Sequence, residues 1–416
     1  MLHNKSQLTL LTIACALSLA GCNESSSSSA GPDFNPDKDT NTDFNQQALV
    51  ENLTDNIITP TFSRFAELAS TQTSDVEAYC TKLDEQINGQ GSADSTSEAK
   101  ATAQASWREA MNSWQEAEVM LLGPLVTNEN LLRNTIYSWP NTNSCGVDYD
   151  VVFYKNNEVN GQPYDITLRI PSRKGMAALE YLLFNESTAH ACDSSEPPEW
   201  STFDDNTIKL ARCAFAGEVA RDIQSNATGL MTSWNADDGY ANQLKQAGNT
   251  SSSIEEIHDA VNRISDAMFY IDSVTKDNKL GKSLGLSANV CGAQACPEQV
   301  ESPYSQHSIE NIAANLVALQ KLFNGDDGTG EAQVGFDDYL KDVGDEDTAK
   351  QLAADIINAI STSKAYTQSL AETLANNPDT ATQSHADVKK VTDNLKTDFI
   401  KSLALELPKT SAGDND

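Results

Sequence analysis

Two glutamates stand where the sequence pattern calls for apolar residues. Glu180 lies in the predicted helix Arg173–Phe184, and every other residue of Met176–Phe184 is apolar or a tyrosine. Glu118 interrupts the apolar stripe of another predicted helix, Glu98–Leu122. A carboxylate that is buried without a partner costs several kcal/mol. Each of these glutamates must therefore be protonated, paired with a cation or bound to a metal.

Two ways of neutralising these carboxylates stay open at the level of sequence. An arginine such as Arg133, Arg169 or Arg173 could pair with either one. Alternatively, Glu118 and Glu180 could face one poorly solvated pocket, which would raise the pKa of one carboxyl or recruit a cation. The second alternative predicts a polar or metal site between two helices.

The stretch from Gly175 to Glu180 resembles the G-x-H-x-x-E signature of the imelysin family, except that Ala177 occupies the histidine position. Imelysins are bacterial envelope proteins first described as metallopeptidases and since linked mainly to iron uptake. Positions three apart share one face of a helix, so the resemblance implies that His and Glu grip one ion together. With only the glutamate kept, it implies an ion held weakly by oxygen ligands and harder than zinc.

Other stretches of the chain are similar to the same family. They are Trp114–Pro124, which ends in Gly-Pro, the pair Trp139 and Pro140 followed by Asp148, the turn Lys279–Gly285, and Glu301–Ser308. The likeness covers roughly Phe44–Leu405. It implies that Trp139, Pro140, Asp148, Ser305 and Ser308 belong to family motifs, although the two serines by themselves indicate caps of the helix that follows.

The N-terminus predicts export and lipidation. Lys5 precedes a short apolar run, Leu8–Ala20, and the sequence Leu-Ala-Gly-Cys at its end resembles a bacterial lipobox. We therefore expect residues 1–21 to be a signal peptide and Cys22 to carry lipid, with Asn23 favouring the outer membrane, on its periplasmic or outer side. Residues 22–43 are rich in Ser, Asn and Asp, a composition typical of a flexible tether.

Six further cysteines predict disulfides, because they are even in number and the chain is exported. They are Cys80, Cys145, Cys192, Cys213, Cys291 and Cys296. Spacing favours the local pairs Cys291–Cys296 and Cys192–Cys213, which leaves Cys80 to pair with Cys145. We expect at least two bridges.

The fold class is predicted to be all-α, with two packed helical bundles and a long irregular insertion in the first half. The first bundle, 44–203, contains the Glu180 helix, the second is 204–407, and 408–416 is a disordered tail. The insertion, Val126–Ile170, includes an alternating run, Tyr149–Tyr154, that suggests a small hairpin. Further helices are expected at Phe44–Ala69, Val76–Ile87, Thr207–Trp234, Ser253–Val274, His307–Phe323, Asp347–Asn376 and Ala386–Leu405.

The net charge and the absence of common catalytic motifs disfavour several classes of function. The 416 residues carry a formal net charge of -32, which disfavours nucleic acid and anionic lipid headgroups and suits cations, although solubility alone also explains it. The chain has no H-E-x-x-H zinc helix and no phosphate-binding loop. No catalytic residue is therefore assigned.

The leading hypothesis, which rests on the family resemblance, is a lipid-anchored protein that binds or takes up iron or another divalent cation without catalysis. Its partners would be the membrane, through its lipid, and a metal ion or metal-transport protein. An imelysin-type metallopeptidase and a structural or interaction lipoprotein with a degenerate site are the alternatives. The missing histidine weakens the peptidase most, because hydrolysis needs a metal-bound water. On the leading hypothesis, Glu180→Gln abolishes weak ion binding and Ala177→His strengthens it.

Overall fold

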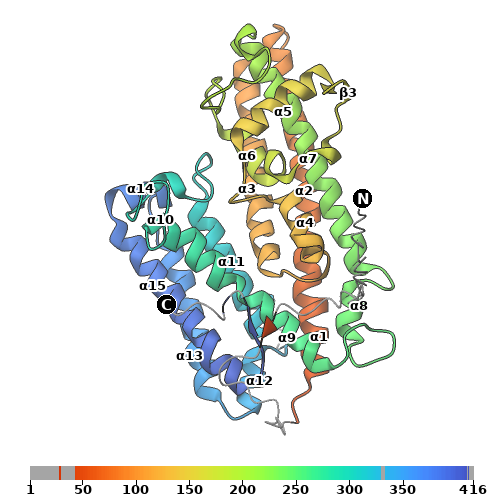
Figure 1. The fold of residues 1–416 in the computed structure, drawn as a ribbon, viewed down its shortest axis with the longest axis vertical. Helices are drawn as coiled ribbons and strands as arrows, with labels where there is room; N and C mark the ends of the chain where they lie inside the picture. The colour runs from red at the N-terminus through yellow and green to blue at the C-terminus, as the bar shows by residue number, and fades with distance from the viewer. Residues whose placement is uncertain (1–27, 30–42, 329–332, 410, 412–416) are drawn as a thin grey trace, which may run out of the picture.

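The computed structural model describes residues 28–29, 43–328, 333–409 and 411. In this part of the chain two helical bundles lie side by side, the first extending well beyond one end of the second (Figure 1). The strands are two residues long and the rest of the regular structure is helical, which confirms the all-α prediction. None of the described helices is long and apolar enough to cross a membrane.

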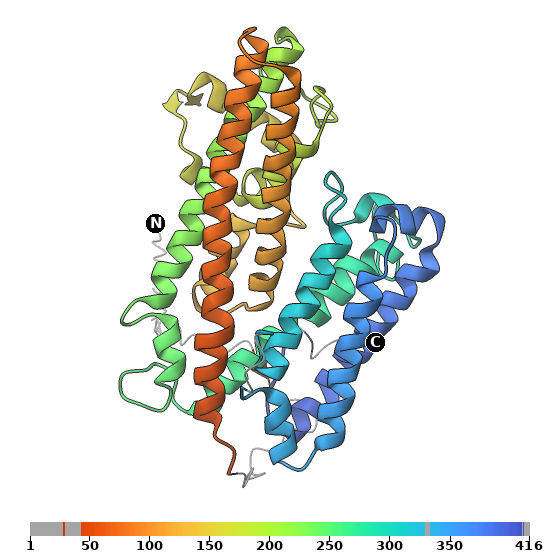
Figure 2. The ribbon, with the colours of Figure 1, turned by 180° about the vertical axis from the view of Figure 1, so that it is seen from behind.

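The first bundle is built on a long antiparallel hairpin with a third helix packed along it (Figure 2). The hairpin consists of α2 (Thr59–Ile87) and α3 (Ala93–Val119), and the third helix is α7 (Asp205–Asn235). Before α2 the chain is already helical, as α1 (Gln46–Asn52) and the π-helical η1 (Leu53–Ile58). The wide turns of η1 end just before Pro60, which has no N–H to donate into a helix, so the predicted kink takes the form of a π-helical segment.

The remaining elements of the first bundle lie between α3 and α7 or directly after α7. They are η2 (Gly123–Leu125), α4 (Thr127–Ile136), α5 (Ser144–Asn156), β2 (Glu158–Val159), β3 (Gln162–Pro163), η3 (Ile166–Leu168), η4 (Pro171–Arg173), α6 (Gly175–Phe184), η5 (Trp200–Thr202) and α8 (Tyr240–Lys245). The insertion that we predicted to be irregular thus contains two helices.

The Tyr149–Tyr154 run is helical, so placing a hairpin there was wrong. Asn143 caps this helix, α5, by accepting a hydrogen bond from the backbone N–H of Gly146. A hairpin does exist a few residues later, where β2 and β3 pair. Its turn is Asn160-Gly161, both at positive φ, which is the conformation that an Asn-Gly pair favours.

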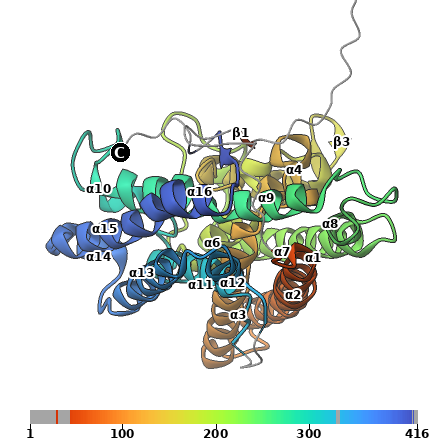
Figure 3. The same ribbon diagram turned by 90° about the horizontal axis from the view of Figure 1, so that it is seen from below.

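The second bundle follows α8 and packs on the first through its helices α9 and α11. Its elements are α9 (Ile257–Met268), the π-helical η6 (Ile271–Gly281), α10 (Lys282–Leu284), η7 (Pro297–Gln299), α11 (Ser308–Asn324), α12 (Phe336–Asp342), α13 (Glu346–Lys364), α14 (Leu370–Asn376), α15 (Pro378–Asn394), η8 (Leu395–Phe399), α16 (Ile400–Ser402) and β4 (Leu407–Pro408). Helix α11 contacts α3 on one side and α13 on the other (Figure 3), and α9 contacts α1.

Two expected boundaries need correction. We placed the start of the second bundle at residue 204, but α7 packs against α2, α5 and α6 and so completes the first bundle. The apolar side chains of α7, among them Phe215 and Val219, are buried there. Within the expected tether, Ser28–Ser29 form β1, which pairs with β4 at the start of the expected tail. Cys22 and the signal peptide lie outside the described residues.

Three disulfides join the six cysteines, and only one of the favoured pairs is present. Cys291–Cys296 is confirmed, whereas the other bridges are Cys80–Cys213 and Cys145–Cys192. The pairings Cys192–Cys213 and Cys80–Cys145 were therefore wrong. Packing of α2 beside α7 brings the Cα atoms of Cys80 and Cys213 to 5.4 Å, although the two residues are 133 positions apart. Spacing along the chain cannot reveal such a contact.

Candidate functional site

Helix α6 is held deep in the first bundle by its own backbone. Gly175, its first residue, has a φ of +80°, and a Cβ there would lie 2.6 Å from the carbonyl oxygen of Ile136. Only glycine tolerates both conditions. The indole N–H of Trp107 donates to the carbonyl of Met176 at 3.0 Å. Every residue from Gly175 to Leu183, Ala177 included, is buried, as the apolar pattern predicted.

Glu180 reaches from α6 to the second bundle. Its Oε1 accepts hydrogen bonds from the backbone N–H of Tyr304 at 3.1 Å and from the backbone N–H and hydroxyl of Ser305, both at 2.8 Å. Ser308 supports the same turn by accepting from the N–H of Ser302 at 3.3 Å. Burial raises the pKa of Glu180 to about 7, against the opposing effect of these hydrogen bonds. Two stretches predicted separately thus meet at one carboxylate.

A second carboxylate, Glu301, lies in the same region and is paired with a buried lysine. Its Oε1 accepts from Lys279 Nζ at 2.9 Å, from the hydroxyl of Tyr137 at 2.8 Å and from the amide of Gln115 at 3.1 Å. Lys279 donates further to Asn315 Oδ1 at 2.9 Å. We call the buried polar region between the bundles, with Glu118, Glu180, Glu301 and their partners, the seam.

Glu118 is neutralised by an arginine, which was the first of the two alternatives that the sequence left open. Its carboxylate forms an ion pair with Arg133, which also donates to the carbonyl of Trp139 at 3.2 Å. The ring of Trp139 in turn lies 5.8 Å from Lys279 Nζ. Burial and the negative charge of Glu118 raise the pKa of Tyr270. Trp139, at a cis peptide bond with Pro140, thus links the two cations of the seam.

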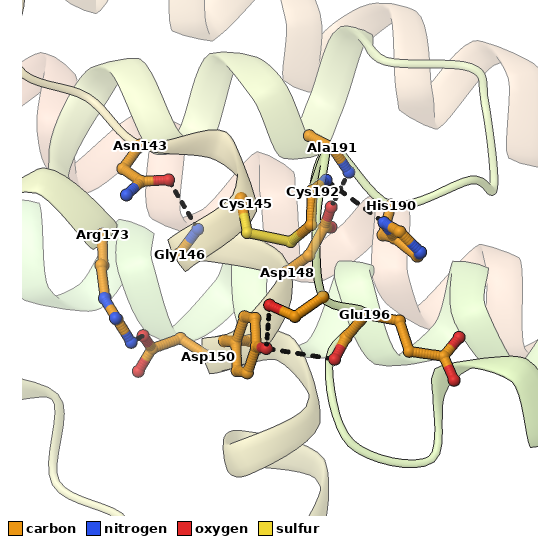
Figure 4. The surroundings of a disulfide bond; sticks show 12 residues. Asn143, Cys145, Gly146, Asp148, Asp150, Arg173, His190, Ala191, Cys192 and Glu196 are labelled. Carbon is orange, nitrogen blue, oxygen red and sulfur yellow. Dashed lines mark hydrogen bonds and ion pairs between the residues drawn. A yellow bond between two sulfur atoms is a disulfide. The ribbon is translucent and has the colours of Figure 1, made fainter.

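Asp148 belongs to a different cluster, inside the first bundle (Figure 4). Its Oδ1 accepts from Arg212 at 2.9 Å, and its Oδ2 accepts from the hydroxyl of Tyr181 at 2.7 Å and from the N–H of Ala191 at 2.8 Å. The Cys145–Cys192 bridge ties α5 to the chain after α6 beside these contacts. We call Asp148, Tyr181, Arg212 and Ala191 the Asp148 cluster.

Arg169 and Arg173, two of the arginines considered for the glutamates, pair elsewhere. Both form ion pairs with Asp150 of α5, Arg169 at 2.5 Å and Arg173 at 3.2 Å. The structure therefore brings Glu118, Glu180, Trp139 and Ser305 into one region and leaves Asp148 outside it.

The residues of the seam do not fit a resident divalent ion. Two of its three carboxylates already face Arg133 and Lys279, and the third has a raised pKa. Among the described residues, no group of three or more His, Cys, Asp or Glu side chains is placed to hold a metal. Glu301 Oε2 and Asn311 Oδ1 are buried acceptors without a hydrogen-bond partner in that part of the chain, so the seam has unused capacity for hydrogen-bond donors.

Sequence reasoning missed Lys279 and Glu301 as site residues. Both stand in stretches that carry the family likeness, and both are buried. The available signal was electrostatic: two buried carboxylates require cations, and a lysine in a turn close after a predicted helix is a candidate. That signal indicates that a basic residue must be present, but it does not show which basic residue pairs with which carboxylate.

Comparisons with known proteins identify a family for this chain and solved structures with the same fold. The sequence model of the family described as Imelysin matches residues 58–397. Among solved structures, a protein named as an iron-regulated protein A precursor from Parabacteroides distasonis is 18% identical, with a TM-score of 0.64 over 89% of this chain and 98% of that one. An imelysin-like protein from Psychrobacter arcticum is 15% identical, with a TM-score of 0.57 over 88% and 98%. Among curated proteins, none matches.

Proposed function

The chain belongs to the imelysin family, and we propose that it acts in the uptake of iron or another divalent cation in the bacterial envelope, without catalysing a reaction. One observation carries the non-catalytic part: Glu118 and Glu301 are already paired with Arg133 and Lys279, and Ala177 replaces the signature histidine. Hydrolysis by a metal-bound water needs carboxylates that are free to bind the metal, and each of these two already faces a buried cation.

The link to iron is supported by the family and by a neighbour of the same fold that is named as iron-regulated. In this proposal the metal is cargo rather than a resident cofactor. The protein contributes by binding a metal-transport protein, because the seam lacks a ligand set for the ion itself. The surplus of 60 acidic over 28 basic residues suits a partner with a basic surface.

The envelope location is supported by the N-terminal sequence and by the cysteines. The run that ends in Leu-Ala-Gly-Cys22 resembles a lipobox, and three disulfides suit an oxidising compartment. We propose an outer-membrane lipoprotein that faces the periplasm or the cell surface.

Deletion of the gene tests the proposal directly. Under iron limitation we expect the deletion strain to accumulate less cell-associated iron than its parent, and a plasmid copy of the full chain to restore it. Cys22→Ser should restore neither iron content nor membrane fractionation. Equal iron in the deletion and parent strains would overturn the uptake role.

A second measurement addresses catalysis. Digestion of a peptide library by the purified full chain with added zinc should give no cleavage beyond the buffer control. Cleavage that disappears in Glu180→Gln would contradict the non-catalytic proposal and restore the metallopeptidase alternative.

A further inference from the structure

A disulfide-closed loop leaves the second bundle between α10 and η7. We call residues 285–296 the stapled loop. The bridge Cys291–Cys296 closes it, and a β-bridge joins Asn289 to Gly292 at its tip. Hydrogen bonds fix both ends: the N–H of Leu286 donates to the carbonyl of Gly281 at 2.9 Å, and the N–H of Cys296 to the carbonyl of Ser283 at 2.8 Å. The loop is thus held in one shape without a bound partner.

The stapled loop exposes apolar side chains in a protein of high net negative charge. Leu286 is 64% exposed and Val290 is 73% exposed. No charged residue occurs from Ser283 to Pro297, although 21% of the chain is charged. Exposed apolar side chains on a rigid, uncharged segment are a feature of protein-binding surfaces.

We infer that the stapled loop is a docking surface for a partner protein that offers an apolar pocket with a basic rim. The inference deepens the proposed function, on which its cellular role rests, by naming the surface that meets the partner. Leu286 and Val290 would fill the pocket. Acidic residues lie on the C-terminal side of the loop: Glu298 is exposed in η7, and Glu372 is exposed on α14, which packs against η7. A basic rim complements these carboxylates.

The net charge of the chain favours a partner protein over two other possible occupants, a second copy of the chain and a lipid surface. A second copy would bring together two chains that each carry -32, and an anionic lipid surface repels the same charge. A partner protein with basic residues around a pocket gains from both the apolar tip and the acidic border. The closed shape of the loop also lowers the entropy lost on binding, because little ordering remains to be done.

Binding measurements on four full-length chains test the surface. Detergent-solubilised envelope proteins of the source bacterium are passed over the immobilised wild type, and a retained protein is purified and titrated against each chain. We expect the Leu286→Ser, Val290→Ser double variant to bind at least about tenfold more weakly, since full burial of either side chain contributes at least the 1.4 kcal/mol that a tenfold change represents. Ile357→Ser is the matched control, because Ile357 is 53% exposed on α13 of the same bundle.

The Cys291→Ala, Cys296→Ala double variant keeps Leu286 and Val290 and removes only the staple. We expect it to bind more weakly than wild type, and wild-type binding to weaken as salt rises from about 0.05 to about 0.5 M. Photo-crosslinks from position 290 should fall on a segment of the partner that contains both apolar and basic residues. Circular dichroism confirms that each chain is folded.

Other outcomes would overturn the inference. Equal affinity of all four chains would exclude the loop as the contact. Sedimentation of wild type as a dimer and of the Leu286→Ser, Val290→Ser variant as a monomer would make a second copy the occupant. Binding of wild type to phosphatidylcholine vesicles, lost in that variant, would make it a lipid surface.

Iron content separates this inference from the proposed function. If the deletion strain keeps normal iron while loop-dependent binding persists, the uptake role fails and the docking surface stands. If the deletion strain lacks iron but the Leu286→Ser, Val290→Ser strain does not, the docking inference fails and the uptake role stands.

Discussion

The seam and the Asp148 cluster each bury carboxylates from stretches that resemble family motifs, yet they are balanced differently. Both oxygens of Asp148 are satisfied, by Arg212 on one side and by Tyr181 and Ala191 on the other. Glu180 receives three hydrogen bonds at one oxygen, and burial raises its pKa to about 7. The Asp148 cluster lies within one bundle, whereas the seam joins residues of both bundles.

The difference separates a structural ion pair from a region that can respond to its surroundings. A fully satisfied network rigidifies its surroundings, whereas buried acceptors without partners and a carboxyl that titrates near neutral pH leave capacity for protons or ligand donors. In the seam that capacity lies at Glu180, Glu301 Oε2 and Asn311 Oδ1. The predictions below test this contrast, from the largest expected effect to the smallest.

Arg212→Met should be the most damaging of these changes. It leaves Asp148 buried without its cation and deprives the carbonyls of Ser187 and Ala189 of their donors. We expect a loss of roughly 3–5 kcal/mol in the free energy of unfolding, measured by urea denaturation. Arg221→Met is the control on the same helix, because Arg221 makes only surface pairs and should cost less than about 1 kcal/mol. Similar losses for both variants would contradict the view that the buried ion pair of Asp148 matters more for stability than the surface pairs of Arg221.

Asp148→Asn and Glu180→Gln should shift stability in opposite directions at pH 8. The first leaves Arg212 without its anion and should destabilise the protein by about 3 kcal/mol. The second removes a carboxyl whose folded pKa, about 7, lies above its ordinary value of 4.5, so the contribution of Glu180 to stability is most favourable below pH 4.5 and is lost as pH rises toward 7. Glu180→Gln should therefore gain up to about 3 kcal/mol at pH 8.

The pH dependence of stability tests the prediction for Glu180→Gln. Between pH 4.5 and 7 the stability gap between Glu180→Gln and wild type should grow, and below this window it should vanish. Unfolding curves at several pH values measure it. A loss of stability in Glu180→Gln at pH 8 would mean that an undetected cation partner balances Glu180.

Ser305→Ala should cost about 1.5–3 kcal/mol at pH 8, because its hydroxyl donates to Glu180 at 2.8 Å and a hydrogen bond to a charged acceptor is worth that much. At pH 4 the acceptor is neutral and the cost should shrink. The same cost at both pH values would show that the hydroxyl supports the turn rather than the charge.

Arg173→Gln should have the smallest effect, less than about 1 kcal/mol by urea denaturation. Asp150 keeps Arg169 at 2.5 Å after the change, and Arg173 is partly exposed. A loss comparable to that of Arg212→Met would mean that Asp150 depends on both arginines, and that this pair is as closed as the Asp148 cluster.

The sequence by itself determined the helices and the exceptional position of Glu180. Helical periodicity and capping residues act within a few turns of chain, so α3, α6, α7 and α11 lie close to where their patterns predict them. The burial of Glu180 followed from one fact, that its helix is apolar on every face. The prediction for the Tyr149–Tyr154 run was wrong because the run alternates over too few residues to separate strand from helix.

Only the tertiary structure decided which partners meet. Arg133, Arg169 and Arg173 are equivalent candidates in the sequence, and packing gives the first to Glu118 and the other two to Asp150. The same holds for Cys80 and Cys213, joined across 133 residues. These contacts depend on how helix faces dock, which is set by shape and volume summed over two bundles. Local pattern carries none of that information, because many dockings bury the same apolar stripe.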